Sequence, residues 1–381
     1  MEILFWLFLF LIVYCYFGYP LLLIFLARSF EKPVHKSAFA PSVSIIVSAW
    51  NEEDVIEAKI KNLLSLDYPD FEILIGSDGS NDRTNTIVKN ISDHRIRFFD
   101  YQQRRGKMAV LNDLVAQARH EFILFTDARQ SLSADALKQL MANFHDSKVG
   151  CVSGELMLSQ KCEGTAQGIN AYWNYEKFLR KQESRLHSML GATGAVYAIR
   201  KSLYVPIPTH LVLDDMFVPL HIIGKGYRAI FDETAHAFDE VAHNPKEEYR
   251  RKARTLYGNF QIFKAFIRMF NPFISPIAFQ FFSHKFLRVM VPILMIMVFM
   301  VNIILVGQFP YNYLFAAQII FYLMALIGGL ARGQKHGIFK PVLGVCFIPY
   351  VFCLLNFSAL VGLFRFIINK QEVTWRKARS S

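Results

Sequence analysis

The sequence has few cysteines, and none of them stands at the spacing of a metal-binding motif. Its five cysteines are Cys15, Cys151, Cys162, Cys346 and Cys353, and three of these lie in apolar segments. Thiols in apolar surroundings usually behave as small buried hydrophobic groups, so a cysteine-based metal cluster is not expected. An internal repeat is also lacking, which argues against a solenoid fold.

Charge is missing from four long stretches of the 381 residues. These stretches are Ile3–Ala27, Val289–Val306, Phe309–Ala331 and Pro341–Phe364. Each is about as long as a helix that crosses the bilayer core. The first lacks a basic region before it and is too long for a cleavable signal, so it is interpreted as an uncleaved anchor. The middle, roughly residues 37–258, has the composition of a water-soluble domain.

The net charge of +11 is partly concentrated beside the apolar stretches. Basic residues follow the first stretch and separate the last two: Arg28, Lys32 and Lys36, then Arg332, Lys335 and Lys340. By the positive-inside rule both regions are cytoplasmic, which places the middle domain in the cytoplasm. This charge fits anionic lipid headgroups, and no nucleic-acid partner is expected.

The basic C-terminal tail conflicts with four full membrane crossings. Its cations are Arg365, Lys370, Arg376, Lys377 and Arg379. They favour the cytoplasm, yet four spans would place them outside. One alternative is that Pro341–Phe364, interrupted by Pro349 and Asn356, is re-entrant or interfacial. The sequence leaves this choice open.

The middle domain alternates apolar strands with amphipathic helices. Strands are expected at Val43–Val47, Glu72–Ser77, Ile96–Phe99 and Phe122–Thr126, and helices at Glu52–Leu64, through Ile87 and Val88, at Gly106–Ala118 and at Ala134–Phe144. Such alternation predicts an α/β fold with a mostly parallel sheet. Further strands are expected at Cys151–Met157, Ala195–Ile199 and Arg228–Phe231, with a long amphipathic helix over Thr165–Leu186. Lys246–Ile277 has the pattern of a helix that lies on the membrane surface.

Three carboxylates follow apolar strand-like runs. Asp78 and Asp127 end the runs EILIGSD and FILFTD, and Asp215 ends LVLDD. Ligands bind at the carboxyl ends of strands in open α/β sheets. Carboxylates placed there can hold a metal ion and a phosphate ester.

The motifs of this domain resemble the family-two glycosyltransferases, which have the GT-A fold. The matching segments are VSIIVSAWNEED at 43–54, EILIGSDGSNDR at 72–83, RRGKMAVLND at 104–113, FILFTDA at 122–128 and VLDD at 212–215. They are most similar to the membrane-embedded branch that includes cellulose, hyaluronan, chitin and poly-N-acetylglucosamine synthases. The resemblance implies a Rossmann-like GT-A domain over 37–245, between an anchor over 1–36, an interfacial segment over 246–285, transmembrane helices over 286–368 and a basic tail over 369–381.

The resemblance assigns the nucleotide-sugar donor to six positions in the first half of the domain. Ser48, Trp50 and Glu52 would hold the base and ribose, Asp78 the uracil or ribose, Lys107 the diphosphate, and Asp127 a bridging Mg²⁺ or Mn²⁺. A Trp face can stack on a pyrimidine. The alternatives are that Trp50 fills the core and that Asp78 is a solvated turn residue.

The metal motif of the family is incomplete here. Relatives carry Asp-x-Asp, whereas this chain reads Asp127-Ala128-Arg129, so a cation replaces the second carboxylate. Either phosphate and water supply the remaining metal ligands, or Arg129 supplies part of the positive charge itself.

The acceptor side is assigned to residues further along the chain. The resemblance implies that Asp215, beside Asp214, is the general base of an inverting transfer, although a pair of carboxylates at a helix start could also serve as a cap. Arg254 stands at the Arg of the family's Gln-x-x-Arg-Trp motif, where it would hold diphosphate, but the Gln and Trp are replaced. The loss of that Trp weakens the case for processive polymerisation. Gly194 and Arg251 are expected at the acceptor pocket, with a plain tight turn as the alternative around Gly194.

These expectations describe an integral protein of the inner or plasma membrane with a cytoplasmic catalytic domain. It would move a sugar from a UDP-sugar to a polysaccharide or lipid-linked acceptor, and a partner subunit or oligomer is expected because the chain has few spans. One alternative is a transferase that places a single sugar on a polyprenyl phosphate. Another is a nucleotide-sensing membrane subunit with an inactive domain.

Overall fold

An eight-stranded mixed sheet forms the centre of the water-soluble domain in the computed structural model, which describes residues 1–159, 165–240, 245–330 and 340–368. The strands are β1 (Val43–Ala49), β2 (Phe71–Asp78), β3 (Ile96–Tyr101), β4 (Phe122–Phe125), β5 (Ser131–Leu132), β6 (Val149–Ser159), β7 (Tyr197–Arg200) and β8 (Arg228–Glu240). Their order is β3-β2-β1-β4-β7-β6-β8-β5. β1, β2, β3 and β4 pair in parallel, as do β6 and β8, whereas β7 and β5 are antiparallel to their neighbours. The predicted α/β fold is confirmed.

Helices cover both faces of this sheet. Successive residues of β1 alternate between two cores, with Ile45 packing in one and Ile46 in the other. The first core lies beneath α3 (Ile56–Leu64) and α6 (Ala136–Ala142), and the second beneath α5 (Lys107–Gln117) and α8 (Asp214–Gly224). A sheet buried on both faces needs continuous apolar strands, which explains runs such as VSIIV.

Several elements begin or end at residues other than those expected from the pattern. α3 starts at Ile56 and not at Glu52, because Asn51 has a φ of 53° and the amide of Glu52 donates to Thr84 Oγ1. Thr84, which accepts this hydrogen bond, is the first residue of the short helix α4 (Thr84–Lys89). β8 extends to Glu240, well beyond Phe231, and the two-residue strand β5 was not expected.

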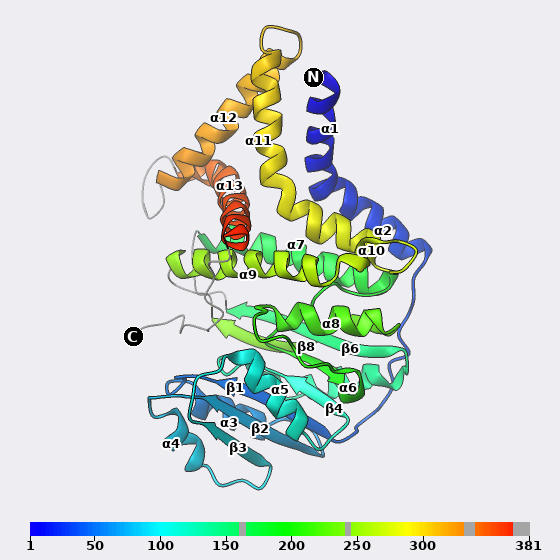
Figure 1. Ribbon diagram of the computed structural model, residues 1–381, viewed down its shortest axis with the longest axis vertical. Coiled ribbons are helices and arrows are strands. Elements are labelled where there is room, and N and C mark those ends of the chain that lie inside the picture. Colours follow the sequence, from blue (N-terminus) through cyan, green and yellow to red (C-terminus); the bar gives the residue numbers. More distant parts are fainter. Residues whose placement is uncertain (160–164, 241–244, 331–339, 369–381) are drawn as a thin grey trace.

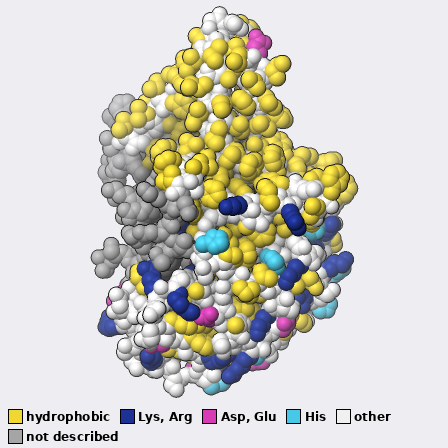
Figure 2. Space-filling model, viewed as in Figure 1, with side chains coloured by type: hydrophobic (Ala, Val, Ile, Leu, Met, Phe, Trp, Pro, Cys, Tyr) yellow, Lys and Arg dark blue, Asp and Glu magenta, His cyan; other side chains and the backbone are white. Residues whose placement is uncertain are grey.

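Apolar helices form the end of the molecule opposite the first strands of the sheet (Figure 1). They are α1 (Glu2–Val13) and α2 (Tyr19–Ser29), joined by a π turn over Tyr14–Gly18, then α10 (Ala278–Gln280), a π turn over Phe281–Phe286, α11 (Leu287–Leu305), α12 (Tyr311–Leu330) and α13 (Lys340–Ile367). Four continuous helical segments among the described residues are long and apolar enough to cross a membrane: Glu2–Ser29, Ala278–Leu305, Tyr311–Leu330 and Gly344–Ile367. Figure 2 shows hydrophobic side chains over this part of the surface, whereas Lys, Arg, Asp and Glu gather over the sheet domain.

Two long helices, α7 (Thr165–Leu186) and α9 (Pro245–Ala265), lie between the sheet and the apolar helices (Figure 1). A buried polar cluster joins α7 to the apolar helices. Glu183 accepts a hydrogen bond from Tyr19 Oη at 2.7 Å and lies 2.7 Å from Nδ1 of His284, and Glu176 pairs with Arg288. Buried charges need such partners, so these pairs fix α7 against the apolar helices.

Candidate active site

The three carboxylates selected from the sequence lie at one edge of the sheet. Asp78 is the last residue of β2, Asp127 follows β4 by two residues, and Asp215 lies in the first turn of α8. β2 and β4 flank β1 in parallel, so their carboxyl ends open on the same side. Asp78 and Asp127 line a common pocket, whose other lining residues are Ser48, Trp50, Arg104, Lys107 and Ala128.

Lys107 lies between the carboxylates of Asp127 and Asp214. Its Nζ lies 3.0 Å from Oδ1 of Asp127 and 3.3 Å from Oδ1 of Asp214. Burial alone would lower the pKa of Lys107, but the carboxylates outweigh burial and raise this pKa above its ordinary value. Lys107 therefore carries its positive charge at physiological pH, where an incoming diphosphate would meet it.

Asp215 has the environment of a general base. Burial, followed by the charge of Asp214, raises the pKa of Asp215 to about 6, although Lys107 and Arg180 act in the opposite direction. A Cβ added to Gly194 would lie 3.4 Å from Oδ2 of Asp215 and 3.9 Å from Oδ2 of Asp127. The backbone of Gly194 therefore lies beside both carboxylates. A pKa near neutrality suits proton abstraction.

Asp214 does not serve merely as a cap for α8. Its Oδ2 accepts a hydrogen bond from Tyr197 Oη at 3.2 Å, and its other oxygen faces Lys107. The N-cap residue, Leu213, makes no side-chain capping bond. Asp214 is therefore held by a buried tyrosine and by the lysine of the pocket.

Asp78 orders the loop that carries the pocket cations. The amides of Arg105 and Gly106 donate to its two carboxylate oxygens at 2.7 and 2.8 Å. The loop also passes close to Gly79, where an added Cβ would lie 2.8 Å from the amide nitrogen of Arg104. Asp78 is therefore a buried anchor of this loop and not a solvated turn residue, and each of its oxygens retains a lone pair for a ligand.

Trp50 lies in the pocket, and one face of its indole is already covered. The guanidinium carbon of Arg104 lies 3.5 Å from the ring centroid, which is a close cation–π contact. The core-filler alternative does not fit, since Trp50 lines the pocket. Ser48 also lines it, whereas Glu52 is only 1% exposed and is not among the residues that line the pocket.

The assigned arginine of α9 faces the same carboxylates. Burial lowers the pKa of Arg254, and Asp214, Asp215 and Asp127 partly offset this effect. Among the described residues its Nε has no hydrogen-bond partner. The side chain of Arg251 lies outside the described residues.

Three further basic residues were not selected from the sequence. Arg104 belongs to the RRGK segment but was not distinguished from its neighbours. Lys59, on α3, is 3% exposed and donates to Thr126 Oγ1 at 2.7 Å and to the carbonyl of Gln130 at 2.6 Å, so it supports the loop of Asp127 from below. Arg180, on α7, donates to Thr193 Oγ1 at 2.7 Å beside Gly194. The sequence pattern does not distinguish Lys59 and Arg180, because each resembles an ordinary charged residue on the polar face of an amphipathic helix.

A divalent metal would find one suitable protein ligand at Asp127. The described residues contain no group of three or more His, Cys, Asp or Glu side chains that could hold a metal ion. Mg²⁺ sites on nucleotides often use only one or two carboxylates, with phosphate and water as the other ligands. The oxygen chemistry of Asp127 fits this type of shared site.

Comparisons with known proteins agree with this geometry. Residues 44–205 match the model of the family described as glycosyl transferase family 2, which confirms the predicted resemblance for this part of the chain. The chain is 26% identical over 253 residues to a poly-beta-1,6-N-acetyl-D-glucosamine synthase of Staphylococcus aureus, and 24% identical over 246 residues to that of Staphylococcus epidermidis. The first match covers 61% of this chain and 61% of the relative's length.

One solved structure has the same overall fold. A mannosyltransferase from Pyrobaculum calidifontis, in complex with GDP-Man and Mn²⁺, superposes with a TM-score of 0.71 at 22% identity. The superposition covers 97% of this chain and all of that chain. The GT-A fold with apolar helices at both ends is therefore established for this chain, and residues 44–205 within it match the family-2 glycosyl transferase model.

Proposed function

We propose that this chain is a membrane-bound inverting glycosyltransferase that moves a sugar from a UDP-sugar to a polysaccharide or lipid-linked acceptor. The observation that carries the proposal is the convergence of Asp127, Asp214 and Asp215 around Lys107 at the edge of the sheet. The match to polysaccharide synthases supports a glycan acceptor, although it spans about three fifths of their length. The apolar helices and the flanking cations support a membrane location with the catalytic domain in the cytoplasm.

The pocket residues divide the chemistry between donor and acceptor. Asp215 takes the proton of the acceptor hydroxyl as that oxygen attacks the anomeric carbon from the side opposite the leaving group. Lys107 and Arg254 stabilise the departing nucleoside diphosphate, while Trp50, Ser48 and the loop held by Asp78 position the nucleotide. A Mg²⁺ or Mn²⁺ ion on Asp127 would neutralise further charge on the diphosphate.

The decisive experiment measures nucleotide release by membranes that contain the full chain. UDP-, GDP- and dTDP-sugars are supplied in turn, with EDTA, Mg²⁺ or Mn²⁺. We expect release from a UDP-sugar, with turnover lowered by chelation and restored by the metal. If no donor gives release above a vector control, the inactive-subunit alternative replaces this proposal.

Asp215→Asn separates chemistry from binding. The amide cannot accept the acceptor proton but keeps the size of the side chain, so transfer should fall by about 10²–10⁴-fold while UDP binding stays near normal. Turnover near the parent level would remove Asp215 from its role as base. Asp127→Asn is the matched variant, because it should weaken Mn²⁺-dependent UDP binding itself.

A polyprenyl phosphate remains the second candidate acceptor. Arg180 and Arg254 each carry an Nε without a hydrogen-bond partner among the described residues. The charge of Arg180 acts to lower the pKa of Asp215, and the charge of Asp215 in turn acts to raise the pKa of Arg254. Such cations suit a phosphate acceptor. Product analysis separates the two: a water-soluble or high-mass glycan supports the first acceptor, and a single sugar in the organic phase supports the second.

A further inference from the structure

The two ends of the last apolar helix, α13, contact different elements: its beginning packs on α12 and its end on α9. α11 and α12 are joined by a short turn at the end of the molecule farthest from the sheet, so α12 runs back toward the catalytic domain (Figure 1). A helix that crosses a bilayer must have its ends on opposite sides. The contacts at the two ends of α13 therefore decide whether it can be a span.

The beginning of α13 packs on the end of α12. A Cβ added to Gly328 would lie only 2.5 Å from the carbonyl oxygen of Cys346, and one added to Gly329 would lie 3.1 Å from the ring of Tyr350. These glycines let the two helix backbones approach closely. The start of α13 is thus level with the returning end of α12.

The other end of α13 rests on α9. A Cβ added to Gly362 would lie 3.0 Å from the amide nitrogen of Tyr257, and the ring of Phe366 stacks on Phe260 with 5.6 Å between centroids. α9 itself is held on the catalytic domain, where Gln261 Nε2 donates to the carbonyl of His210 at 2.8 Å. The end of α13 therefore lies against the catalytic domain.

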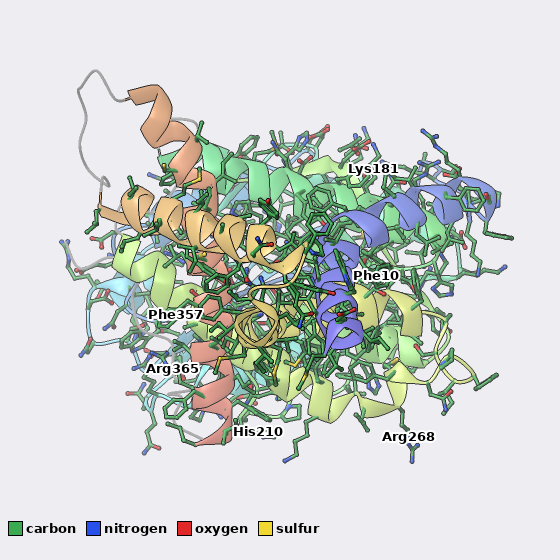
Figure 3. The ribbon with its side chains drawn as sticks, turned by 90° about the horizontal axis from the view of Figure 1, so that it is seen from above. Phe10, Lys181, His210, Arg268, Phe357 and Arg365 are labelled. Atoms are coloured by element: carbon green, nitrogen blue, oxygen red, sulfur yellow. The ribbon has the colours of Figure 1, made fainter. Side chains whose placement is uncertain are left out.

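The direction of α13 agrees with these contacts. In Figure 3, which looks onto the apolar helices from above, α11 is seen nearly along its axis, whereas α13 runs across the view past Phe357 and Arg365. The second half of α13 has one buried and one exposed face. Ala359 and Gly362 are buried, and the exposed face is apolar, with Phe357, Phe364 and Ile367. An exposed apolar side on a helix parallel to the membrane plane fits the boundary between headgroups and acyl chains.

We infer that α13 lies in the bilayer interface on the side of the catalytic domain and does not cross the membrane. Its partner is lipid of that leaflet, and the chain then crosses the bilayer three times. This arrangement places the basic tail on the catalytic side, which removes the conflict between four spans and the tail's charge. The inference does not depend on the proposed transferase activity.

Depth measurements in reconstituted full-length protein test the inference. Phe357 lies near the middle of α13 and Ile320 near the middle of α12, and both side chains are 57% exposed. Phe357→Trp should be quenched most by lipids brominated near the headgroup, and Ile320→Trp by lipids brominated near the chain end. The signal is the quenching added to that of the parent, which has four tryptophans. Equal depth for the two variants would overturn the inference.

A reporter experiment needs no substitution in the helices. Alkaline phosphatase or green fluorescent protein is fused after Ser381 of the full chain, and a second set carries the reporter in the α11–α12 turn at Gln308. We expect a fluorescent, phosphatase-inactive tail and a phosphatase-active Gln308 insertion. Phosphatase activity at the tail would mean that α13 spans the bilayer.

Discussion

The buried lysine beneath the Asp127 loop should make folding depend on pH. Burial lowers the pKa of Lys59 from 10.5 to about 7, and the charge of Asp127 offsets only part of this. The unfolded chain therefore binds one more proton than the folded chain between these two values. Stability contributed by this group is complete above pH 10.5, decreases as the pH falls, and is fully lost below about pH 7.

The expected magnitude follows from the two pKa values. Each pH unit between them is worth about 1.4 kcal/mol, so raising the pH from 7 to 10 should add about 3–4 kcal/mol to the free energy of unfolding through this group alone. Lys59→Met keeps the length of the side chain and removes the charge. The free energy of unfolding of the variant should not increase in this way. Relative to the parent, the variant should therefore be about 3–4 kcal/mol less stable at pH 10 than it is at pH 7.

Urea unfolding of the purified protein in detergent at several pH values provides the measurement. Lys61→Met is the matched control, because Lys61 lies on the same helix with a side chain that is 71% exposed. Its stability curve should run parallel to that of the parent. If the Lys59→Met curve is also parallel to the parent, Lys59 is charged in the folded protein and the reasoning fails.

Two further predictions concern the base and the donor loop. The acidic limb of the kcat/KM pH profile should lie near pH 6, and Arg180→Met should move this limb to higher pH, because Arg180 stabilises the ionised form of Asp215. Arg180→Lys keeps the positive charge and should leave the limb in place. If Arg180→Met lowers the rate but does not move the limb, the role of Arg180 is purely structural. Gly79→Ala should lower the melting temperature and weaken UDP binding, since its Cβ would displace the backbone of Arg104 at a φ of 66°, at a cost of roughly 1–3 kcal/mol. Gly226→Ala controls for strain alone, because Gly226 lies outside the pocket, its φ is 88° and no atom lies within 4 Å; equal effects of the two substitutions would contradict the steric explanation.

The sequence predicted those parts of the site that depend on strand ends. A parallel strand fixes where its last residue lies, so Asp78 and Asp127 could be assigned to one edge from the sequence alone. The role of Asp78 was less predictable. Its bonds to the amides of Arg105 and Gly106 depend on a loop conformation that strand periodicity does not encode.

The cations around the pocket show where pattern analysis stops. Lys59 comes from α3, which covers one face of the sheet, and Arg180 comes from α7, which lies between the sheet and the apolar helices. Their Nζ and guanidinium groups reach the site through tertiary packing. A helical pattern states which face is buried but not that one long polar side chain on it extends to a distant loop. The prediction of membrane crossings from the sequence was limited in the same way. The hydropathy of α13 is that of a membrane-spanning helix, whereas its contacts with α12 and α9 are those of a helix in the bilayer interface.

The altered metal motif has a physical counterpart in these cations. Where relatives carry a second carboxylate, this chain has Arg129, and Lys107 already lies 3.0 Å from the remaining Asp127. Lys107, Arg254 and Arg180 together bring three fixed positive charges to the carboxylates, and a diphosphate would displace part of that ion pairing. The pocket should therefore keep measurable UDP affinity in EDTA, and most of that affinity should be lost in Lys107→Met. Calorimetry without metal measures it directly: if chelation abolishes UDP binding while Lys107→Met leaves metal-dependent binding unchanged, the lysine is only a partner for the carboxylates, and the metal alone recruits the donor.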